Sequence, residues 1–400
     1  MFRQLLIASL IAACVHGAPS PRPPPPATPQ FFNNVTVFAP PESWVSHSTS
    51  YARSVLLDQN CEKDNVLLAS WTFSPPDGPY LPIAKSTDDG YSWTEISRVY
   101  FTHGNYTGGI ILQPFLFELP QQIGKYPAGT ILATGNAIPA NFASTNIELY
   151  ASQDKGLTWE FVSVVATGGA PNTDNGATPV WEPFIGIYDN QVLVYYSDQR
   201  DPLHGQKLSL QTSHNLLQWG GVINAVAFAN YTQRPGMATV AQIGNGKWMI
   251  SHEVGLAPQG DLAPYAVHYS IADSPLEFGS APSHLLQARN TGTISSAGPY
   301  TVWTPAGGPH GTIVVSDSTY SQVFINTNNG DPDSWDEVET GLGVSYTRGL
   351  RVMPNESVIL FMNGGYYGLP AATVTAGEWL VPGPPSSKDT ISSCKNPHGH

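Results

Sequence analysis

The octapeptide Ser152-Gln-Asp-Lys-Gly-Leu-Thr-Trp159 recurs almost letter for letter as Ser86-Thr-Asp-Asp-Gly-Tyr-Ser-Trp93. In both copies the Ser and Asp side chains can bind backbone N–H groups across a tight turn. The Gly tolerates the positive φ that such a turn often needs. The Trp that ends each copy can fold back and cover the turn. We therefore expect each copy to clasp the two strands of a β-hairpin.

Degraded copies of the octapeptide continue along the chain at a period of about 60 residues. The hydroxyl-to-Trp spacing persists from Thr212 to Trp219, and Asn326 to Trp335 keeps the turn with two extra residues, whereas near Phe278 only the aromatic residue remains. This period suits a four-stranded propeller blade with generous loops. The octapeptide resembles the Asp-box of sialidases and related β-propellers, so we expect it to be structural and to carry no chemistry.

Alternating apolar runs bounded by Gly, Pro, Asn and Asp assign the strands to six blades. The innermost strands are expected near residues 54–57, 110–117, 184–188, 238–243, 300–303 and 350–353. The fourth and sixth blades show no clear outermost strand. The run Val35-Thr-Val-Phe38 is left over before the first blade, and supplying it to the sixth would close the ring and remove an open edge. The predicted fold class is all-β, a six-bladed β-propeller with Asp-box turns; a misread last blade would leave five.

Composition and charge agree with this fold and restrict the partners. Only 12% of the 400 residues are charged, and the chain contains 38 Gly and 36 Pro, which is typical of short strands joined by turns. The net charge of −13 disfavours binding to nucleic acid or to anionic membranes. A neutral polysaccharide is a better match, and we expect a monomer.

The first residues predict export from the cell. Arg3 precedes an apolar run over residues 5–15, and small residues follow at Gly17-Ala18, so residues 1–18 read as a secretory signal peptide. The apolar run is too short to span a bilayer. We expect a Pro-rich leader over residues 19–33, a catalytic propeller over 34–383, a C-terminal tail over 384–400, and a secreted, extracellular protein.

Export makes two modifications possible. Cys14 leaves with the signal peptide, so Cys61 and Cys394 remain and can pair in an oxidising compartment; two free thiols are the alternative. Such a bond would tie the first blade to the tail. Four Asn-x-Ser/Thr sequons are candidates for N-glycosylation: Asn34, Asn105, Asn230 and Asn355.

The topology turns distant residues into neighbours at one rim of the central channel. Within a blade the two innermost strands are antiparallel, so the start of the first meets the end of the second. Among the side chains placed there are Gln113, Gly298 and Asn363. Ten further rim residues are candidates for binding substrate: Tyr51, Arg53, Trp71, Asn136, Trp181, Asp198, Arg234, Asp317, Tyr346 and Arg348. The aromatic ones could stack on sugar faces or belong to the core, and Asp198 could orient a sugar hydroxyl, tune Glu182 or cap a turn.

Two carboxyl groups stand out in this ring. Glu182 opens the innermost strand of the third blade and Glu253 closes the second strand of the fourth, so both are expected at the same rim. Each could simply cap backbone N–H groups, but a pair of carboxyl groups is what glycoside hydrolysis requires. The apolar neighbours of Glu182 should raise its pKa and make it the acid, whereas Arg234 should keep Glu253 ionised as the nucleophile. The opposite assignment stays open.

Other chemistries find no support in the sequence. The segment Ser251-His-Glu253 lacks the second His of a zinc-protease helix and lies in a strand pattern, so we expect no metal site. No phosphate-binding Gly loop precedes a helix, and we expect no cofactor. A Gly-x-Ser-x-Gly elbow of a serine hydrolase is also absent from the sequence.

Several segments together resemble fungal exo-1,5-α-L-arabinanases of glycoside hydrolase family 93. They are Trp181-Glu-Pro-Phe184, the run from Tyr195 to Lys207, Arg234-Pro-Gly-Met237 and His252-Glu253. The similarity covers most of the mature chain, without the leader and the Cys-bearing tail. It implies a six-bladed propeller and retaining release of arabinobiose from the ends of linear arabinan. It also implies two catalytic glutamates, which map onto Glu182 and Glu253.

Two other functions remain as alternatives. A sialidase would need an arginine cluster, for which Arg53, Arg234 and Arg348 are available, and a tyrosine–glutamate nucleophile pair such as Tyr346 and Glu253; the negative net charge argues against it. A propeller lectin would repeat one sugar-binding set in every blade. The rim residues here differ from blade to blade, which favours a single asymmetric site.

Overall fold

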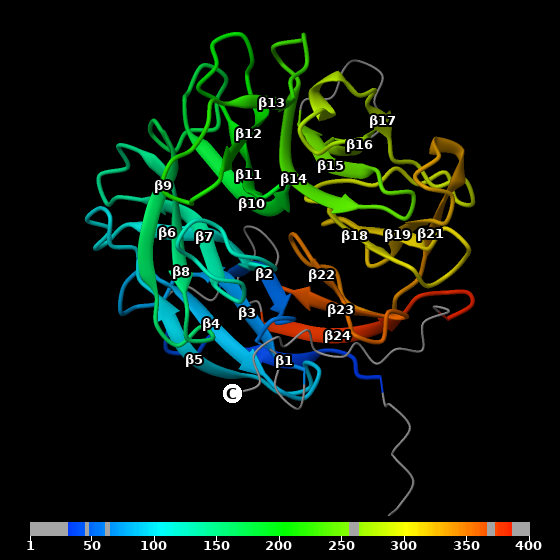
Figure 1. The fold of residues 1–400 in the computed structure, drawn as a ribbon, viewed down its shortest axis with the longest axis horizontal. Coiled ribbons are helices and arrows are strands. Elements are labelled where there is room, and N and C mark those ends of the chain that lie inside the picture. Colours follow the sequence, from blue (N-terminus) through cyan, green and yellow to red (C-terminus); the bar gives the residue numbers. More distant parts are fainter. Residues whose placement is uncertain (1–30, 45–47, 61–64, 256–263, 366–372, 386–400) are drawn as a thin grey trace, which may run out of the picture. The chain divides into compact units, whose positions relative to one another are not determined.

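The prediction of a six-bladed β-propeller is confirmed by the structure, a computed structural model that describes residues 31–44, 48–60, 65–255, 264–365 and 373–385. The 24 strands of this part of the chain form six antiparallel sheets of four strands each. All six belong to the unit that starts at Phe32. Within that unit they surround a central axis, and the strands nearest to it are β2, β6, β10, β14, β18 and β22 (Figure 1).

The strands follow the repeat in chain order. Blade 1 contains β2 (Thr49–Leu56), β3 (Leu67–Phe73), β4 (Leu81–Ser86) and β5 (Thr94–Val99). Blade 2 contains β6 (Ile110–Glu118), β7 (Ile131–Ile138), β8 (Thr145–Ser152) and β9 (Glu160–Gly168). Blade 3 contains β10 (Val180–Tyr188), β11 (Gln191–Asp198), β12 (Lys207–Ser213) and β13 (Ile223–Val226).

The second half of the ring repeats this order with shorter outer strands. Blade 4 contains β14 (Arg234–Gln242), β15 (Trp248–Gly255), β16 (Ala266–Ala272) and β17 (His284–Leu285), with the 3-10 turn η1 (Phe278–Ser280) before β17. Blade 5 contains β18 (Tyr300–Thr304), β19 (Thr312–Ser316), β20 (Val323–Asn326), the 3-10 turn η2 (Pro332–Ser334) and β21 (Trp335–Val338). The outermost strand of blade 4 was not predicted from the sequence, because two residues are too few to show alternation.

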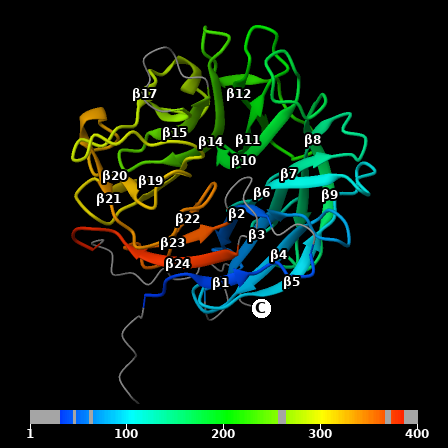
Figure 2. The ribbon, with the colours of Figure 1, turned by 180° about the vertical axis from the view of Figure 1, so that it is seen from behind.

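Blade 6 is assembled from both ends of the described chain. It contains β22 (Gly349–Val352), β23 (Val358–Asn363) and β24 (Val374–Leu380), and β1 (Val35–Phe38) pairs antiparallel with β24 as the outermost strand. The view from behind shows β1 alongside β24 (Figure 2). The N-terminal segment therefore covers the edge that blade 6 would otherwise expose.

The repeated octapeptides make the turns that the sequence suggests, and the Trp residue of the second copy joins two neighbouring blades. In the second copy the hydroxyl of Ser152 accepts the N–H of Gly156 at 2.8 Å, and Asp154 Oδ1 accepts the N–H of Thr158 at 2.9 Å. The indole Nε1 of Trp159 then donates to Ser97 Oγ of blade 1 at 3.1 Å. The second copy thus clasps a hairpin of its own blade and the outermost strand of the blade before it. In the first copy the indole of Trp93 donates instead to the carbonyl oxygen of Gly90 in its own turn, at 2.8 Å.

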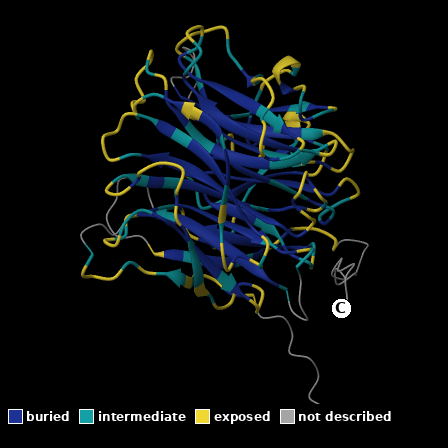
Figure 3. Cartoon of the chain, turned by 60° about the vertical axis from the view of Figure 1, so that its left-hand side comes forward, coloured by how far each residue is buried: buried dark blue, intermediate teal, exposed yellow. Residues whose placement is uncertain are grey.

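Buried residues follow the strands and exposed residues gather in the loops (Figure 3). Apolar side chains fill the spaces between adjacent blades, as in the cluster that contains Leu68, Ile83 and Leu116 from blades 1 and 2. Within the described ranges, no helix is long and apolar enough to cross a membrane. Asn34, Asn105, Asn230 and Asn355 are exposed, whereas Cys61 and Cys394 lie outside the described residues.

We predict that Ser163→Ala weakens the contact between blades 2 and 3. Ser163 Oγ accepts the indole N–H of Trp219 at 3.0 Å and donates to the carbonyl oxygen of Leu216 at 2.6 Å. Removing the hydroxyl leaves both groups without a partner, so the free energy of unfolding in urea should fall by about 1–3 kcal/mol. The control is Thr167→Ala on the same strand, where the exposed side chain should contribute less than about 0.5 kcal/mol. Equal losses in the two variants would contradict the clasp.

Candidate active site

The innermost strand of every blade is distorted near the rim of the central channel. One residue of each strand entry has a positive φ, between 46° and 61°: Tyr51, Gln113, Glu182, Met237, Gly298 and Thr347. In blades 1 to 4 the pairing with the second strand shifts register at this point, which is the mark of a β-bulge. The distortion frees backbone N–H groups from the sheet, so they need acceptors elsewhere.

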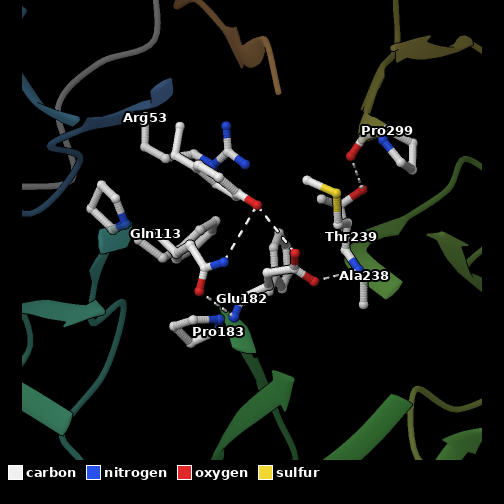
Figure 4. Close-up of a pocket in the computed structure, with 12 residues that line it drawn as sticks. Arg53, Gln113, Glu182, Pro183, Ala238, Thr239 and Pro299 are labelled. Atoms are coloured by element: carbon white, nitrogen blue, oxygen red, sulfur yellow. Dashed lines mark hydrogen bonds between the residues drawn. The ribbon is translucent and has the colours of Figure 1, made fainter. Parts of the chain in front are cut away.

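Those N–H groups find their acceptors in the preceding blade. The N–H of Glu182 donates to Gln113 Oε1 at 2.9 Å, and the N–H of Met237 donates to Glu182 Oε2 at 3.1 Å. The N–H of Gly298 donates to Glu253 Oε2 at 2.8 Å. The first two bonds can be followed in Figure 4, where the Glu182 side chain points into the pocket. Both candidate carboxyl groups are thereby fixed at the rim.

Glu182 sits among hydrogen-bond donors. Tyr51 donates its hydroxyl to Oε1 at 3.1 Å, and Ser197 donates its hydroxyl to Oε2 at 2.7 Å, in addition to the N–H of Met237. Burial raises the pKa of Glu182 above its ordinary value, while these three donors and the positive charge of Arg234 act in the opposite direction. Three donors on one carboxyl group favour its ionised form.

Glu253 has a poorer set of partners. The N–H of Gly298 is its one hydrogen-bond donor among the described residues. Burial first, and then the negative charge of Glu182, raise its pKa to about 8, and the N–H of Gly298 offsets only part of this. The effect of Glu182 on this pKa means that the two carboxyl groups are close enough to interact. Gly236 is the cross-strand partner of Glu253, and a Cβ on Gly236 would lie 3.6 Å from Glu182 Oε2. The backbone around Gly236 therefore brings the two glutamates close together.

The expectation that Arg234 keeps Glu253 ionised is wrong. The Arg234 guanidinium donates to Asn175 Oδ1 at 2.6 Å, to the Gly205 carbonyl at 3.1 Å and to Gln206 Oε1 at 3.0 Å. Its charge acts on Glu182 instead. The apolar sequence neighbours of Glu182 suggested an apolar environment for its carboxyl group. In the structure, hydrogen-bond donors from other strands surround that carboxyl group.

Aromatic and cationic side chains close the pocket around Glu182. The rings of Tyr51 and Tyr346 meet edge to face with centroids 5.4 Å apart, and the Arg53 guanidinium lies 5.0 Å from the centroid of the Tyr300 ring. Arg53 also donates to the carbonyl oxygen of Thr347 at 2.7 Å. The residues that line the pocket are Tyr51, Arg53, Gln113, Pro114, Phe115, Glu182, Pro183, Phe184, Met237, Ala238, Thr239 and Pro299.

Trp181 lies beside the pocket and is half-buried. Its indole N–H donates to Gln199 Oε1 at 3.2 Å, and Gln199 in turn donates its amide to the carbonyl oxygen of Asp174 at 3.1 Å. The ring is therefore held by the loop that follows β11. It remains a candidate for contact with a sugar next to Glu182.

Two of the proposed binding residues belong to the structural core. Trp71 is 1% exposed and stacks on Phe38 with centroids 5.2 Å apart, so its ring has no free face for a sugar. Asn136 is buried and donates its amide to the carbonyl oxygen of Val180 at 2.8 Å, which ties blade 2 to blade 3. The predictions for both were wrong, because a position at a strand end does not reveal the face on which the side chain lies.

Three charged candidates have their charges satisfied by nearby structure. Asp198 forms a two-pronged pair with Arg200, at 2.8 and 2.7 Å, and also accepts the hydroxyl of Ser209. It caps its own turn by accepting the backbone N–H of Arg200 at 3.0 Å. These partners lower its pKa despite the burial. Asp317 is fully buried and accepts the N–H groups of residues 296, 319 and 320. Arg348 is fully buried and donates to the carbonyl oxygens of residues 321, 322 and 343. None of the three lines the pocket.

Sequence reasoning missed four residues that build the site. Gln113 and Gly298 were placed at the rim but were given no role, and Ser197 and Met237 were not considered. Ser197 directly precedes Asp198, and Met237 ends the Arg-Pro-Gly-Met segment, so both could have been included as strand-end neighbours. Gln113 contacts both Glu182 and Tyr51: its side chain accepts the Glu182 N–H and donates to Tyr51 Oη at 3.5 Å.

Among the described side chains, no group of three or more His, Cys, Asp or Glu could hold a metal ion. The site contains two carboxyl groups, a tyrosine hydroxyl and backbone donors. Such a set can donate a proton, accept one, and stabilise a negative charge on one carboxyl group.

Solved structures with the same fold include close relatives. The α-L-arabinofuranosidase Arb93A from Fusarium graminearum, in complex with an iminosugar inhibitor, is 40% identical with a TM-score of 0.82 over 88% of this chain and 98% of that chain. The same fungus's GH93 α-L-arabinofuranosidase with arabinobiose is 39% identical, with the same TM-score and coverage. An α-L-arabinanase from Penicillium chrysogenum, complexed with arabinobiose, is 38% identical with a TM-score of 0.82 over 88% and 99% of the two chains.

More distant structures share the fold alone. The NanB sialidase from Streptococcus pneumoniae is 11% identical with a TM-score of 0.58. No protein-family model matches the chain, and no curated protein matches it.

We predict that Glu253 makes the stability of the wild-type protein fall with rising pH. Its pKa is about 8 in the folded state against an ordinary value of 4.5, so folding favours the protonated form. That contribution is full below about pH 4.5 and is lost as the pH rises through 8. Unfolding in urea at pH 5 and at pH 8 should therefore show that the wild type loses stability relative to Glu253→Gln. Parallel profiles would contradict the raised pKa.

Proposed function

The chain belongs to glycoside hydrolase family 93, and we propose that it is a retaining exo-arabinanase that releases arabinobiose from the ends of linear α-1,5-L-arabinan. One observation carries the proposal: two neighbouring carboxyl groups at the same rim have unequal environments, Glu182 with three hydrogen-bond donors and Glu253 with one. The relatives that bind arabinobiose indicate the sugar.

We assign the nucleophile to Glu182 and the acid and base to Glu253, the reverse of the assignment that the sequence favoured. A nucleophile must be ionised, and the donors Tyr51, Ser197 and Met237 favour the ionised form of Glu182. A general acid must carry a proton at neutral pH, which a pKa of about 8 provides for Glu253.

The reaction then takes two steps. In the first, a Glu182 carboxylate oxygen attacks the anomeric carbon, the glycosidic C–O bond breaks, and Glu253 gives its proton to the departing oxygen. In the second, Glu253 takes a proton from water, whose oxygen attacks the anomeric carbon and releases Glu182 as a carboxylate. Each step forms one bond to the anomeric carbon and breaks another, so the configuration is retained after two inversions.

A sialidase-like activity is less well supported. Arg348 is committed to backbone carbonyls, Arg53 donates to Thr347 and Arg234 to the loop of Gln206, so the three arginines do not form one cluster for a substrate carboxylate. The similarity to a sialidase extends to the fold alone. The net charge of −13 also suits a neutral substrate.

We further propose that the protein is secreted. The signal peptide over residues 1–18 supports this, and the four sequon asparagines are exposed, as N-glycosylation requires. A disulfide between Cys61 and Cys394 would fit the same compartment. A monomer that binds neither nucleic acid nor membranes remains part of this proposal.

The experiment that tests the function is product analysis on linear arabinan. Wild-type protein should release a disaccharide from chain ends from the earliest time points, without a fall in viscosity ahead of sugar release. Glu182→Gln and Glu253→Gln should each lose at least about 10³-fold in rate, because each removes a group that takes part in bond making or breaking. Undiminished turnover in either variant would overturn the site, and hydrolysis of a sialoside but not of arabinan would overturn the substrate.

The two roles can be told apart by rescue with azide. With an aryl arabinoside that needs no acid, Glu253→Ala should form a glycosyl-enzyme that azide intercepts, giving an arabinosyl azide of retained configuration. Glu182→Ala lacks the nucleophile, so direct attack by azide should give the inverted anomer. Proton NMR of the products distinguishes the two, and the opposite pattern would exchange the assignments.

A further inference from the structure

Among the methionines of the described chain, Met237 is the one that lines the pocket around Glu182. The other three, Met249, Met353 and Met362, belong to the apolar clusters of the core. Met237 is also buried, but it is a member of none of those clusters. Its side chain therefore forms part of the pocket wall instead of the packing between blades.

The sulfur of Met237 is held in place from two sides. Tyr346 donates its hydroxyl to Met237 Sδ at 3.6 Å. A Cβ on Gly298 would lie 3.3 Å from the terminal methyl carbon Cε, so the methyl group packs against the backbone there. A thioether sulfur has two lone pairs and is a weak acceptor, and the tyrosine hydroxyl occupies one of them. The second lone pair stays available for reaction.

Both neighbours of this sulfur support the catalytic carboxyl groups. The ring of Tyr346 packs edge to face against that of Tyr51, whose hydroxyl donates to Glu182. The N–H of Gly298 is the donor to Glu253. A change in the size or polarity of the sulfur therefore acts on the supports of both glutamates.

The pocket admits a small oxidant. Its free space of about 20 Å³ is enough for one water-sized molecule. Hydrogen peroxide is only slightly larger than water. The three core methionines are enclosed by close-packed apolar side chains, where a polar molecule finds neither space nor hydrogen bonds.

We propose that Met237 is an oxidation site through which hydrogen peroxide inactivates the enzyme. The sulfur attacks one peroxide oxygen, so an S–O bond forms and the O–O bond breaks. The proton on the bound oxygen passes to the departing hydroxide, which leaves as water. Sulfur loses two electrons and the peroxide gains them, and the thioether becomes a sulfoxide. The loss of activity rests on the proposed function, whereas the oxidation itself does not.

The sulfoxide changes the pocket in both size and charge. Its oxygen is a stronger acceptor than a thioether sulfur, so it competes for the Tyr346 hydroxyl and shifts the ring that packs against Tyr51. It also brings a partial negative charge toward the ionised Glu182, which that carboxylate opposes. With one extra atom in a packed site, the oxidised protein should be about 10- to 100-fold slower on linear arabinan.

Peptide mapping and activity, measured on the same samples, test this proposal. Wild-type protein is exposed to increasing hydrogen peroxide at neutral pH, quenched with free methionine, and divided between mass spectrometry and the initial rate on linear arabinan. Met237 should gain an oxygen atom before Met249, Met353 and Met362 do. The rate should fall in proportion to the fraction of Met237 that is oxidised.

Leucine variants supply matched controls, because Leu replaces Met at nearly constant volume and has no sulfur. Met237→Leu should keep its own starting rate, whatever that rate is, at peroxide concentrations that slow the wild type about tenfold. Met353→Leu removes a sulfur from the core and should lose activity to peroxide as the wild type does.

A Met237 that stays reduced while a core methionine is oxidised would overturn the proposal. So would full activity in wild-type protein whose Met237 is converted, a result that does not depend on the folding of either variant. Equal inactivation of Met237→Leu and the wild type would also overturn it. Failure of the proposed function looks different: untreated wild type would leave linear arabinan intact, while mass spectrometry would still give the order in which the methionines are oxidised.

Discussion

The site depends on one constraint, the need of the freed N–H groups at the rim for acceptors. In each blade a residue of positive φ lies within or just before the innermost strand and turns backbone away from the sheet. The N–H groups of Gln113, Met237, Gly298 and Thr347 are then accepted by side chains from the blade before. A buried N–H without an acceptor costs about 1–3 kcal/mol, so each of these N–H groups fixes the side chain that accepts it.

The chemical identity of those acceptors distinguishes structural positions from candidate catalytic ones. In two blades a neutral hydroxyl is the acceptor: Thr72 accepts the N–H of Gln113, and Ser318 accepts the N–H of Thr347. At the strand entries of Met237 and Gly298 the acceptors are the carboxyl groups of Glu182 and Glu253. Burying a charge where a neutral group would serve is costly, so capping alone does not account for these two glutamates.

The sequence predicted the blades well and the site only in part, for physical reasons. Strand alternation and the repeated turn are local, so they gave the strand β1 and most inner strands within a few residues. The site is made by long-range contacts: the Tyr51 hydroxyl that binds Glu182 comes from 131 residues away in the chain. Trp71 and Arg348 were predicted to bind substrate for the same reason. Alternation places a residue at a strand end, but it does not show whether the side chain packs in the core or bonds to backbone carbonyl groups instead.

The same contacts account for the proposed role of Glu253 as acid in the first step and base in the second. The negative charge of Glu182 is one of the causes that raise the pKa of Glu253. Once Glu182 is esterified by the sugar that charge is gone, so the pKa of Glu253 must fall. Glu253 has by then lost its proton to the leaving oxygen, and the lower pKa keeps it ionised until water arrives. In the proposed mechanism the second step is therefore prepared by the first, without any movement of the propeller.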